Sequence, residues 1–206
     1  MPASQDGVQL DRRIRRTQQL IVDAFLSLCA EKDYDSIIIK DITERANVNR
    51  STFYAHYEDK ERLLKKITGD RLAELTELAN SSLSSGYKPS FDAPDPYFSE
   101  MFEHLTAHKT FYAVMLNRIH HSLFSDPMLE VIRESFFSRI SSISKDQKLL
   151  IPLDLLLDYV SYSVHGMIKK WLAQSMVYSP DHMALQLTRL SYLGVYRAMG
   201  IPDRQP

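Results

Sequence analysis

The chain has 206 residues, of which 44% are hydrophobic, so it can bury a sizeable core as one large or two small domains. Its formal net charge is −1, which excludes a protein that holds nucleic acid through an overall basic charge. The single cysteine, Cys29, excludes an internal disulfide, and we expect a buried structural thiol in a cytoplasmic protein. The most apolar later run, residues 149–157, is broken by Pro152 and Asp154, so we expect no contact with a membrane.

The first predicted helix covers residues 11–33, after eight polar residues that we expect to be loose. Ile21, Phe25 and Leu28 recur at the spacing of one helix face, and Leu20 broadens that apolar stripe.

Four arginines crowd into residues 12–16, at the start of this helix. The first 66 residues hold 12 Lys and Arg against 11 Asp and Glu, so the basic charge is local. A solvated helix end would explain such a cluster. We favour contact with DNA, because guanidinium groups ahead of a DNA-binding motif can grip phosphates or enter a minor groove.

Residues 38–57 have the pattern of a helix-turn-helix. Ile38, Ile42 and Ala46 form one apolar stripe on a short helix, and Asn47 tolerates the left-handed conformation that ends it. Asn49 then offers a side-chain oxygen to cap a second helix. A turn this short is typical of the motif.

The second helix of this motif keeps one face free for DNA. Phe53 is the apolar anchor that packs inward. Recognition helices present their first turns to the major groove, and the side chains that project there are Arg50, Ser51, Thr52 and Tyr54.

The run YDSIIIKDITERANVNRSTFYAHYEDKERLL, residues 34–64, resembles the DNA-binding domain of the TetR family of bacterial transcriptional repressors. Ile38 stands where the family commonly has a capping Thr or Ser, which is expected to cost about 1 kcal/mol of local stability. Asn47 stands where Gly is usual, a mild change because Asn accepts the same conformation. The residues expected to contact DNA are Arg15, Arg16, Lys40, Asn49, Arg50, Ser51, Thr52, Tyr54, His56, Tyr57 and Lys60.

The remaining pattern is helical throughout, so the predicted fold is all-α with about nine helices. A long fourth helix runs from about residue 59 to 80, and residues 80–96 are rich in Ser and Pro, which predicts a loop. The expected domains are a three-helix DNA-binding domain, residues 9–58, and a larger regulatory and dimerisation domain, residues 59–200. Further helices are predicted at residues 97–109, 110–124, 127–143, 153–178 and 180–199, with Pro127 in a first turn.

The second half resembles a C-terminal regulatory domain found in part of the TetR family, through HKTFYAVML and DYVSYSVHGMIKKWLAQSMVYSP. In that family the last two helices build a four-helix dimer interface, and the domain interior holds a small-molecule effector. The resemblance therefore implies a homodimer. The last two helices also carry more apolar residues than one core can use: Leu155, Leu156, Leu157, Leu185, Leu187, Leu190, Leu193 and Val195.

Aromatic and methionine side chains in the second half form a candidate effector pocket. Ordinary core packing would explain each one singly, but as a set they suit an apolar or aromatic molecule with one or two polar groups. The expected ligand-binding residues are Phe102, Phe111, Tyr112, Met115, Tyr162, His165 and Trp171.

No other chemistry is expected. His104 and His108 stand one helical turn apart and His120 with His121 follow, but no third ligand has a matching spacing, so we predict no metal. The chain lacks a G-x-S-x-G elbow and a glycine-rich phosphate loop, so we predict neither an enzyme nor a cofactor.

Two functions fit this sequence. In the first, the chain is a dimeric repressor that binds a palindromic, double-stranded operator and is released by the effector. In the second, it is a TetR-like coactivator that acts through a protein partner without contacting DNA. The cationic and polar face at Arg50 favours the first.

Overall fold

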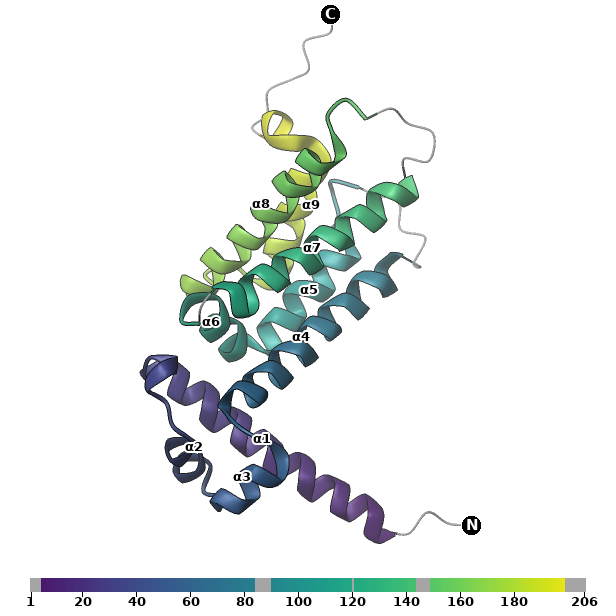
Figure 1. The fold of residues 1–206 in the computed structure, drawn as a ribbon. Coiled ribbons are helices and arrows are strands. Elements are labelled where there is room, and N and C mark those ends of the chain that lie inside the picture. Colours follow the sequence, from purple (N-terminus) through teal and green to yellow (C-terminus); the bar gives the residue numbers. More distant parts are fainter. Residues whose placement is uncertain (1–4, 84–89, 120, 144–148, 199–206) are drawn as a thin grey trace, which may run out of the picture. The chain divides into compact units, whose positions relative to one another are not determined.

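The computed structural model describes residues 5–83, 90–119, 121–143 and 149–198. Within these ranges the chain forms nine α-helices, one short 3-10 helix and no strand, which confirms the predicted all-α class (Figure 1). The chain divides into two compact units, Met1–Arg71 and Leu72–Pro206. The division falls inside helix α4 (Lys60–Leu83), which therefore contributes to both units.

Helix α1 (Gln5–Glu31) begins earlier than predicted. Residues 5–8, expected to be loose, form its first turns, because extending an existing helix over polar residues costs little. Residues 1–4 lie outside the described ranges. The buried stripe is narrower than predicted, since Leu20 is 44% exposed. Cys29 is buried as predicted, and burial raises the pKa of its thiol to about 11.

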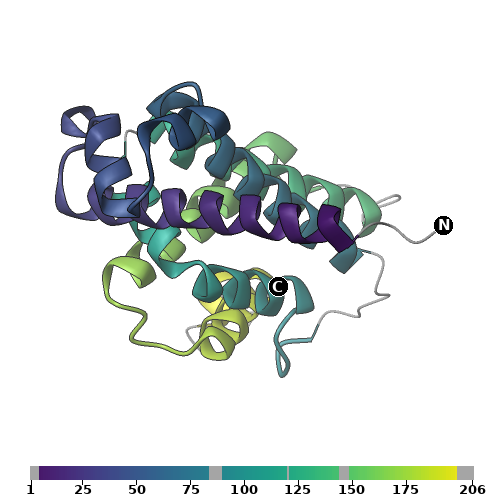
Figure 2. The ribbon, with the colours of Figure 1, turned by 90° about the horizontal axis from the view of Figure 1, so that it is seen from below.

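Helices α2 (Ile39–Ala46) and α3 (Arg50–His56) follow α1 through a short 3-10 helix, Tyr34–Ser36. Ile42, Ala46 and Phe53 are buried, as the sequence predicts. Ile38, the first member of the predicted stripe, is 57% exposed, because it precedes α2 at the N-cap position. The N-terminal part of α1 extends beyond α2 and α3 (Figures 1 and 2). This first unit is thus a helix-turn-helix supported by one long helix.

The loop predicted at residues 80–96 starts later than expected, because α4 continues to Leu83. Residues 84–89 lie outside the described ranges. Helix α5 (Pro96–Ala107) begins where Asp95 accepts a hydrogen bond from the Tyr97 N–H at 2.9 Å, and proline at the first position suits a helix start.

The helix predicted over residues 110–124 is two helices, α6 (Lys109–Asn117) and α7 (His121–Ile143). The last predicted turns belong to α7, so Pro127 lies inside that helix and not in its first turn. Phe124 and Met128 are both fully buried on either side of Pro127. The burial of these two side chains stabilises a continuous helix through Pro127, although proline by itself favours the start of a helix.

Helix α8 (Leu153–Ala173) ends five residues before its predicted end. Ser175 and Met176 both have a φ of 56°, in the left-handed region, and the Met176 N–H donates to the Trp171 carbonyl at 2.9 Å. Helix α9 (Pro180–Ala198) follows and is interrupted at Gly194, whose φ of 68° suits glycine. Residues 199 and 200, at the end of the predicted second domain, lie outside the described ranges.

In the second unit, α7 packs along α8 and α5 packs along α9 (Figure 1). The rings of Phe102 on α5 and Trp171 on α8 meet edge to face at 5.0 Å. The carboxylate of Asp95 also accepts two hydrogen bonds from Arg139 on α7, at 2.6 and 3.0 Å. The Asp95 N–H donates to the Thr188 hydroxyl on α9 at 2.7 Å. The buried Asp95 therefore connects the start of α5 to both α7 and α9.

Candidate nucleic-acid interface

The turn between α2 and α3 has the predicted geometry. Asn47 lies in the left-handed region, with φ 53° and ψ 47°, and the Val48 N–H donates to the Thr43 carbonyl at 3.0 Å. Asn49 lies at the N-cap position of α3, but its side chain makes no capping hydrogen bond, which corrects the predicted cap. Its carbonyl instead accepts from the Thr52 N–H at 2.9 Å. The Asn49 side chain is therefore not used to start the helix.

The start of α2 compensates in part for the missing capping hydroxyl at Ile38. The Ile38 N–H donates to the Asp41 carboxylate at 3.2 Å, which is one of the two bonds of a capping box. This hydrogen bond, followed by the nearby lysine ammonium of Lys32, lowers the pKa of Asp41. An acidic side chain in the first turn also suits the helix dipole.

Helix α3 presents one polar face to solvent. Arg50, Ser51 and Tyr54 are exposed, and Thr52 and His56 are half-buried. The Arg50 guanidinium donates to the Tyr54 hydroxyl at 3.1 Å, and its carbon lies 5.6 Å from the centre of the tyrosine ring. A guanidinium has five N–H donors, so most remain for the acceptors of a guanine edge or a phosphate.

Phe53 and Tyr57 support this face from behind. Phe53 is fully buried, and its ring centre lies 5.8 Å from that of Tyr57. Tyr57, which the sequence places among the DNA contacts, is only 8% exposed, and burial raises its pKa. Its ring therefore fixes the orientation of α3 and offers little surface to a ligand.

Lys60, another predicted contact, is half-buried at the start of α4. Its ammonium donates to the carbonyls of Tyr34 and Ile37 at 2.8 and 2.9 Å, and it lies 4.2 Å from the centre of the Tyr34 ring. Two of its three donors are thus engaged inside the protein. Lys60 joins α4 to the segment that leads into α2.

The other predicted basic contacts outside α3 are exposed. Arg15 and Arg16 lie in the N-terminal half of α1. Lys40 lies on α2, and its ammonium is 3.7 Å from the Glu44 carboxylate. Exposed pairs of this kind are weak, so Lys40 can exchange its partner for a phosphate at little cost.

The predicted effector residues lie in different environments. Five of the seven are buried in the core: Phe102, Phe111, Tyr112, Met115 and Trp171. Tyr162 is 64% exposed, because it precedes Trp171 by nine residues and so lies on the opposite side of α8. His165 is half-buried, with a ring nitrogen 2.9 Å from the Ser125 hydroxyl.

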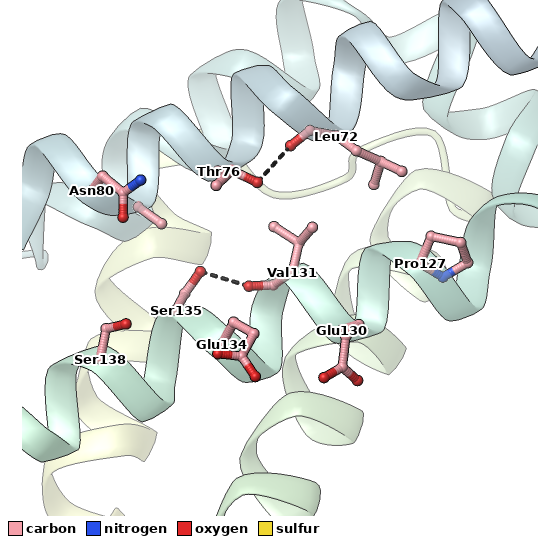
Figure 3. A pocket seen from close by; sticks show the side chains of 10 residues that line it. Leu72, Thr76, Asn80, Pro127, Glu130, Val131, Glu134, Ser135 and Ser138 are labelled. Atoms are coloured by element: carbon pink, nitrogen blue, oxygen red, sulfur yellow. Dashed lines mark hydrogen bonds between the residues drawn. The ribbon is translucent and has the colours of Figure 1, made fainter.

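A groove of about 450 Å³ lies elsewhere, between α4 and α7, and none of the seven residues lines it (Figure 3). Val131 of α7 points toward α4 across the groove. The hydroxyls of Thr76 and Ser135 are bonded to carbonyls of their own helices, at 2.9 and 2.7 Å. The wall is therefore more apolar than its residue types suggest. Its members are Leu72, Thr76, Ala79, Asn80, Pro127, Glu130, Val131, Glu134, Ser135 and Ser138.

Comparison with known proteins covers both units. Residues 21–67 match the family described as bacterial regulatory proteins, tetR family, and residues 92–192 match a transcriptional regulator C-terminal region. The chain belongs to the TetR family of transcriptional regulators. The first match contains α2, the turn and α3, so the exposed face at Arg50 lies in the family's helix-turn-helix.

Solved TetR-type structures share the fold. A TetR transcriptional regulator from Streptococcus agalactiae 2603V is 26% identical, with 96% of this chain and 99% of that chain covered and a TM-score of 0.60. FadR from Bacillus subtilis, in complex with stearoyl-CoA, is 16% identical, with 86% and 98% covered and a TM-score of 0.64. At that identity the second likeness shows the fold alone.

A curated relative is similar over a shorter stretch. The uncharacterized HTH-type transcriptional regulator YxbF of Bacillus subtilis (strain 168) is 46% identical over 70 residues. This stretch is 34% of the present TetR-family chain but only 18% of that relative's length. In the described part of the chain, no helix is long and apolar enough to cross a membrane.

One structural contact of the TetR helix-turn-helix could not be read from the sequence. Arg45 on α2 donates to both carboxylate oxygens of Glu31 on α1 at 2.8 Å, and to the Ser27 hydroxyl at 2.7 Å. The Arg45 guanidinium is the first cause of the lowered pKa of Glu31. This bidentate pair joins α1 to α2, and its partners are too far apart in sequence for a helix-spacing argument to find.

Proposed function

We propose that the chain is a dimeric repressor of transcription that binds a palindromic operator and is released by a small molecule. The main observation in support of this function is that Arg50, Ser51 and Tyr54 are exposed on a helix whose other side is fixed by the buried Phe53. Side chains on a helix that is held by a buried anchor can enter the major groove without a large cost of ordering.

The proposed contacts divide into base reading and backbone binding. Arg50 reads a base edge, most readily the two acceptors of a guanine. Tyr54, His56 and Lys40 contact phosphates, and the Arg15 and Arg16 pair reaches the backbone or the adjacent minor groove. Only the first kind of contact discriminates between sequences, so loss of the second kind weakens binding to all DNA.

The proposed dimer uses an exposed stripe on α8. Leu155, Tyr159 and Tyr162 are 59%, 60% and 64% exposed, at a spacing that places them on one helix face. Gly166 continues the stripe, and a Cβ added there would meet nothing within 4 Å. A second copy can therefore approach α8 closely and cover the three apolar side chains. Two-fold symmetry would place two recognition helices about 34 Å apart, one turn of DNA.

Leu190 on α9 extends the apolar surface available to a partner, being 38% exposed. Other members of the predicted surplus serve the monomer, since Leu157 and Leu187 are buried core. The side chain of Val195 lies outside the described residues. The proposed interface thus rests on α8 first and on α9 second.

The proposed effector site is the groove between α4 and α7. Val131, Leu72 and Ala79 give it an apolar wall, which suits the apolar or aromatic molecule expected from the sequence. Glu130 and Glu134 are exposed at its rim, so a neutral or cationic polar end is favoured over an anionic one. Because α4 also belongs to the first unit, a ligand that moves α4 can change operator affinity.

Selection of bound sequences from a random pool of duplex DNA tests this function. The proposal expects a palindrome whose half-site centres are about one helical turn apart, or slightly more. Recovery of no preferred sequence would overturn it and favour the coactivator that acts through a protein partner. A reporter gene placed downstream of the recovered palindrome tests the sign of regulation. A repressor should lower the expression of this reporter when the protein is present.

A further inference from the structure

Three potential metal ligands converge between α4 and α5. His104 and His108 lie one turn apart at the C-terminal end of α5, and Glu74 lies on α4. One carboxylate oxygen of Glu74 is 3.7 Å from the Nε2 atom of His104 and 3.9 Å from that of His108. The ligand atoms of all three residues lie within 4.8 Å of one another.

The two separations between Glu74 and the histidines are close to the distance between two ligands of one metal ion and are too long for hydrogen bonds. Both nitrogen-to-oxygen distances exceed the range in which a side-chain hydrogen bond forms. Ligands at about 2.1 Å from a tetrahedral zinc ion stand about 3.4 Å apart, so the two Glu74–histidine separations need only a few tenths of an ångström of closure, and the bound of 4.8 Å for the whole set leaves at most about 1.4 Å for the widest pair. The side chains are 42%, 12% and 32% exposed for Glu74, His104 and His108, so an ion can enter from solvent.

The donor set selects the kind of ion. Two imidazole nitrogens and one carboxylate suit Zn²⁺ and its first-row neighbours, whereas Mg²⁺ and Ca²⁺ prefer oxygen ligands throughout. Three protein ligands leave a fourth position for water. The His104 Nε2 atom lies 2.8 Å from the buried Tyr112 hydroxyl, so a metal ion that binds this nitrogen must displace that hydrogen bond.

We propose that Glu74, His104 and His108 bind one divalent first-row metal ion per chain, with zinc as the reference ion. From the sequence we predict no metal, because no third ligand follows the two histidines at a matching spacing. The third ligand comes from another helix, thirty residues earlier, where spacing carries no signal. The bound ion cross-links α4 to α5.

This cross-link has a regulatory consequence, which rests on the proposed function. Helix α4 is shared by both units, and Glu74 follows their division by three residues. An ion that fixes this part of α4 against α5 biases the positions that α4 can adopt. Metal binding and operator binding are then coupled, and the coupling must be equal in both directions.

Metal binding is tested on the untagged full chain without DNA, by titration with Co²⁺ alone and then by competition with Zn²⁺. The parent should show one saturable site per chain with the visible absorption of a low-symmetry Co²⁺ complex, which Zn²⁺ abolishes. Glu74→Gln and His108→Gln should each weaken binding by at least about tenfold. Glu77→Gln, an exposed carboxylate on the same helix, is the matched control and should bind like the parent.

Absence of a saturable site, or equal binding by the parent and both ligand variants, overturns the metal site. Because no DNA is present, this result is independent of the proposed function. Operator titration with and without Zn²⁺ then tests the coupling. The parent should change affinity at least about fivefold and Glu74→Gln should not change. An equal response of the two proteins would contradict the regulatory consequence.

Discussion

The Arg50 guanidinium donates a hydrogen bond of 3.1 Å to the Tyr54 phenol oxygen, one turn further along α3. Both side chains are exposed, so this bond restrains a long, flexible side chain on the face proposed to read DNA. Restraint before binding lowers the entropy lost on binding. Tyr54 therefore has two proposed tasks, to orient Arg50 and to contact a phosphate.

Arg50→Ala should weaken operator binding by about 1–3 kcal/mol and relax the preference at one base pair in each half-site. Tyr54→Phe keeps the ring but removes the hydroxyl, and should cost about 1 kcal/mol without relaxing base preference. Electrophoretic mobility-shift titrations on the selected operator measure both. Lys109→Ala removes one exposed positive charge from the second unit and serves as the control for net charge. Operator affinity of Arg50→Ala equal to that of the parent would remove α3 as the reading face.

Lys60→Met should destabilise the first unit by about 2 kcal/mol, because it leaves the carbonyls of Tyr34 and Ile37 without their charged donor. Chemical denaturation followed by circular dichroism measures the loss. Lys60→Arg offers a control that retains the charge. A stability equal to that of the parent, with a salt dependence of DNA binding reduced by about one unit per subunit, would instead make Lys60 a phosphate ligand.

Tyr159→Lys combined with Tyr162→Lys should dissociate the proposed dimer, because it places two charges in each copy of the apolar stripe that the dimer would bury. We expect the dimer dissociation constant to rise at least about hundredfold, which is about 2.7 kcal/mol. Light scattering gives the mass, and retained helical circular dichroism excludes unfolding. Leu150→Lys, at a fully exposed leucine outside the stripe, should remain dimeric. A parent protein that is monomeric at micromolar concentration would refute the interface directly.

Val131→Trp should fill the groove between α4 and α7 while leaving the operator-reading face unchanged. Operator binding without effector should stay within about twofold of the parent, and an effector-induced loss of about 1–3 kcal/mol should fall toward zero. Fluorescence anisotropy of labelled operator measures both. Phe137→Trp, at an exposed position of the same helix, is the control and should respond normally. Full induction of Val131→Trp would exclude the groove as the effector site.

The helix-turn-helix could be predicted from the sequence because its determinants are local. The burial of Ile42, Ala46 and Phe53 follows from helix spacing alone, and Asn47 marks the turn by its tolerance of a left-handed backbone. The exposure of Arg50 follows from the same spacing. Local rules failed at Asn49, whose side chain makes no capping bond while its backbone carbonyl accepts from the N–H groups of Thr52 and Phe53.

The contacts that join separate segments could not be predicted. A lysine just after a recognition helix is typical of a phosphate ligand, but two carbonyls more than twenty residues earlier accept hydrogen bonds from the Lys60 ammonium. Glu74 has no sequence relation to the histidines of α5. The effector set stays a prediction, because the spacing of aromatic residues does not by itself show which of them face the same pocket. Tyr162 and Trp171 are half a revolution apart on α8.

The central claim is that two copies of α3 read two half-sites of one operator. Its most direct measurement is a titration of the full chain, at physiological salt, against the selected palindrome and against the same duplex with one half-site scrambled. Two protomers should bind the intact palindrome together, and scrambling should reduce affinity at least about hundredfold, since several base pairs of a half-site each contribute about 1–3 kcal/mol. Equal affinity for the two duplexes, or one protomer per intact palindrome, would contradict the claim.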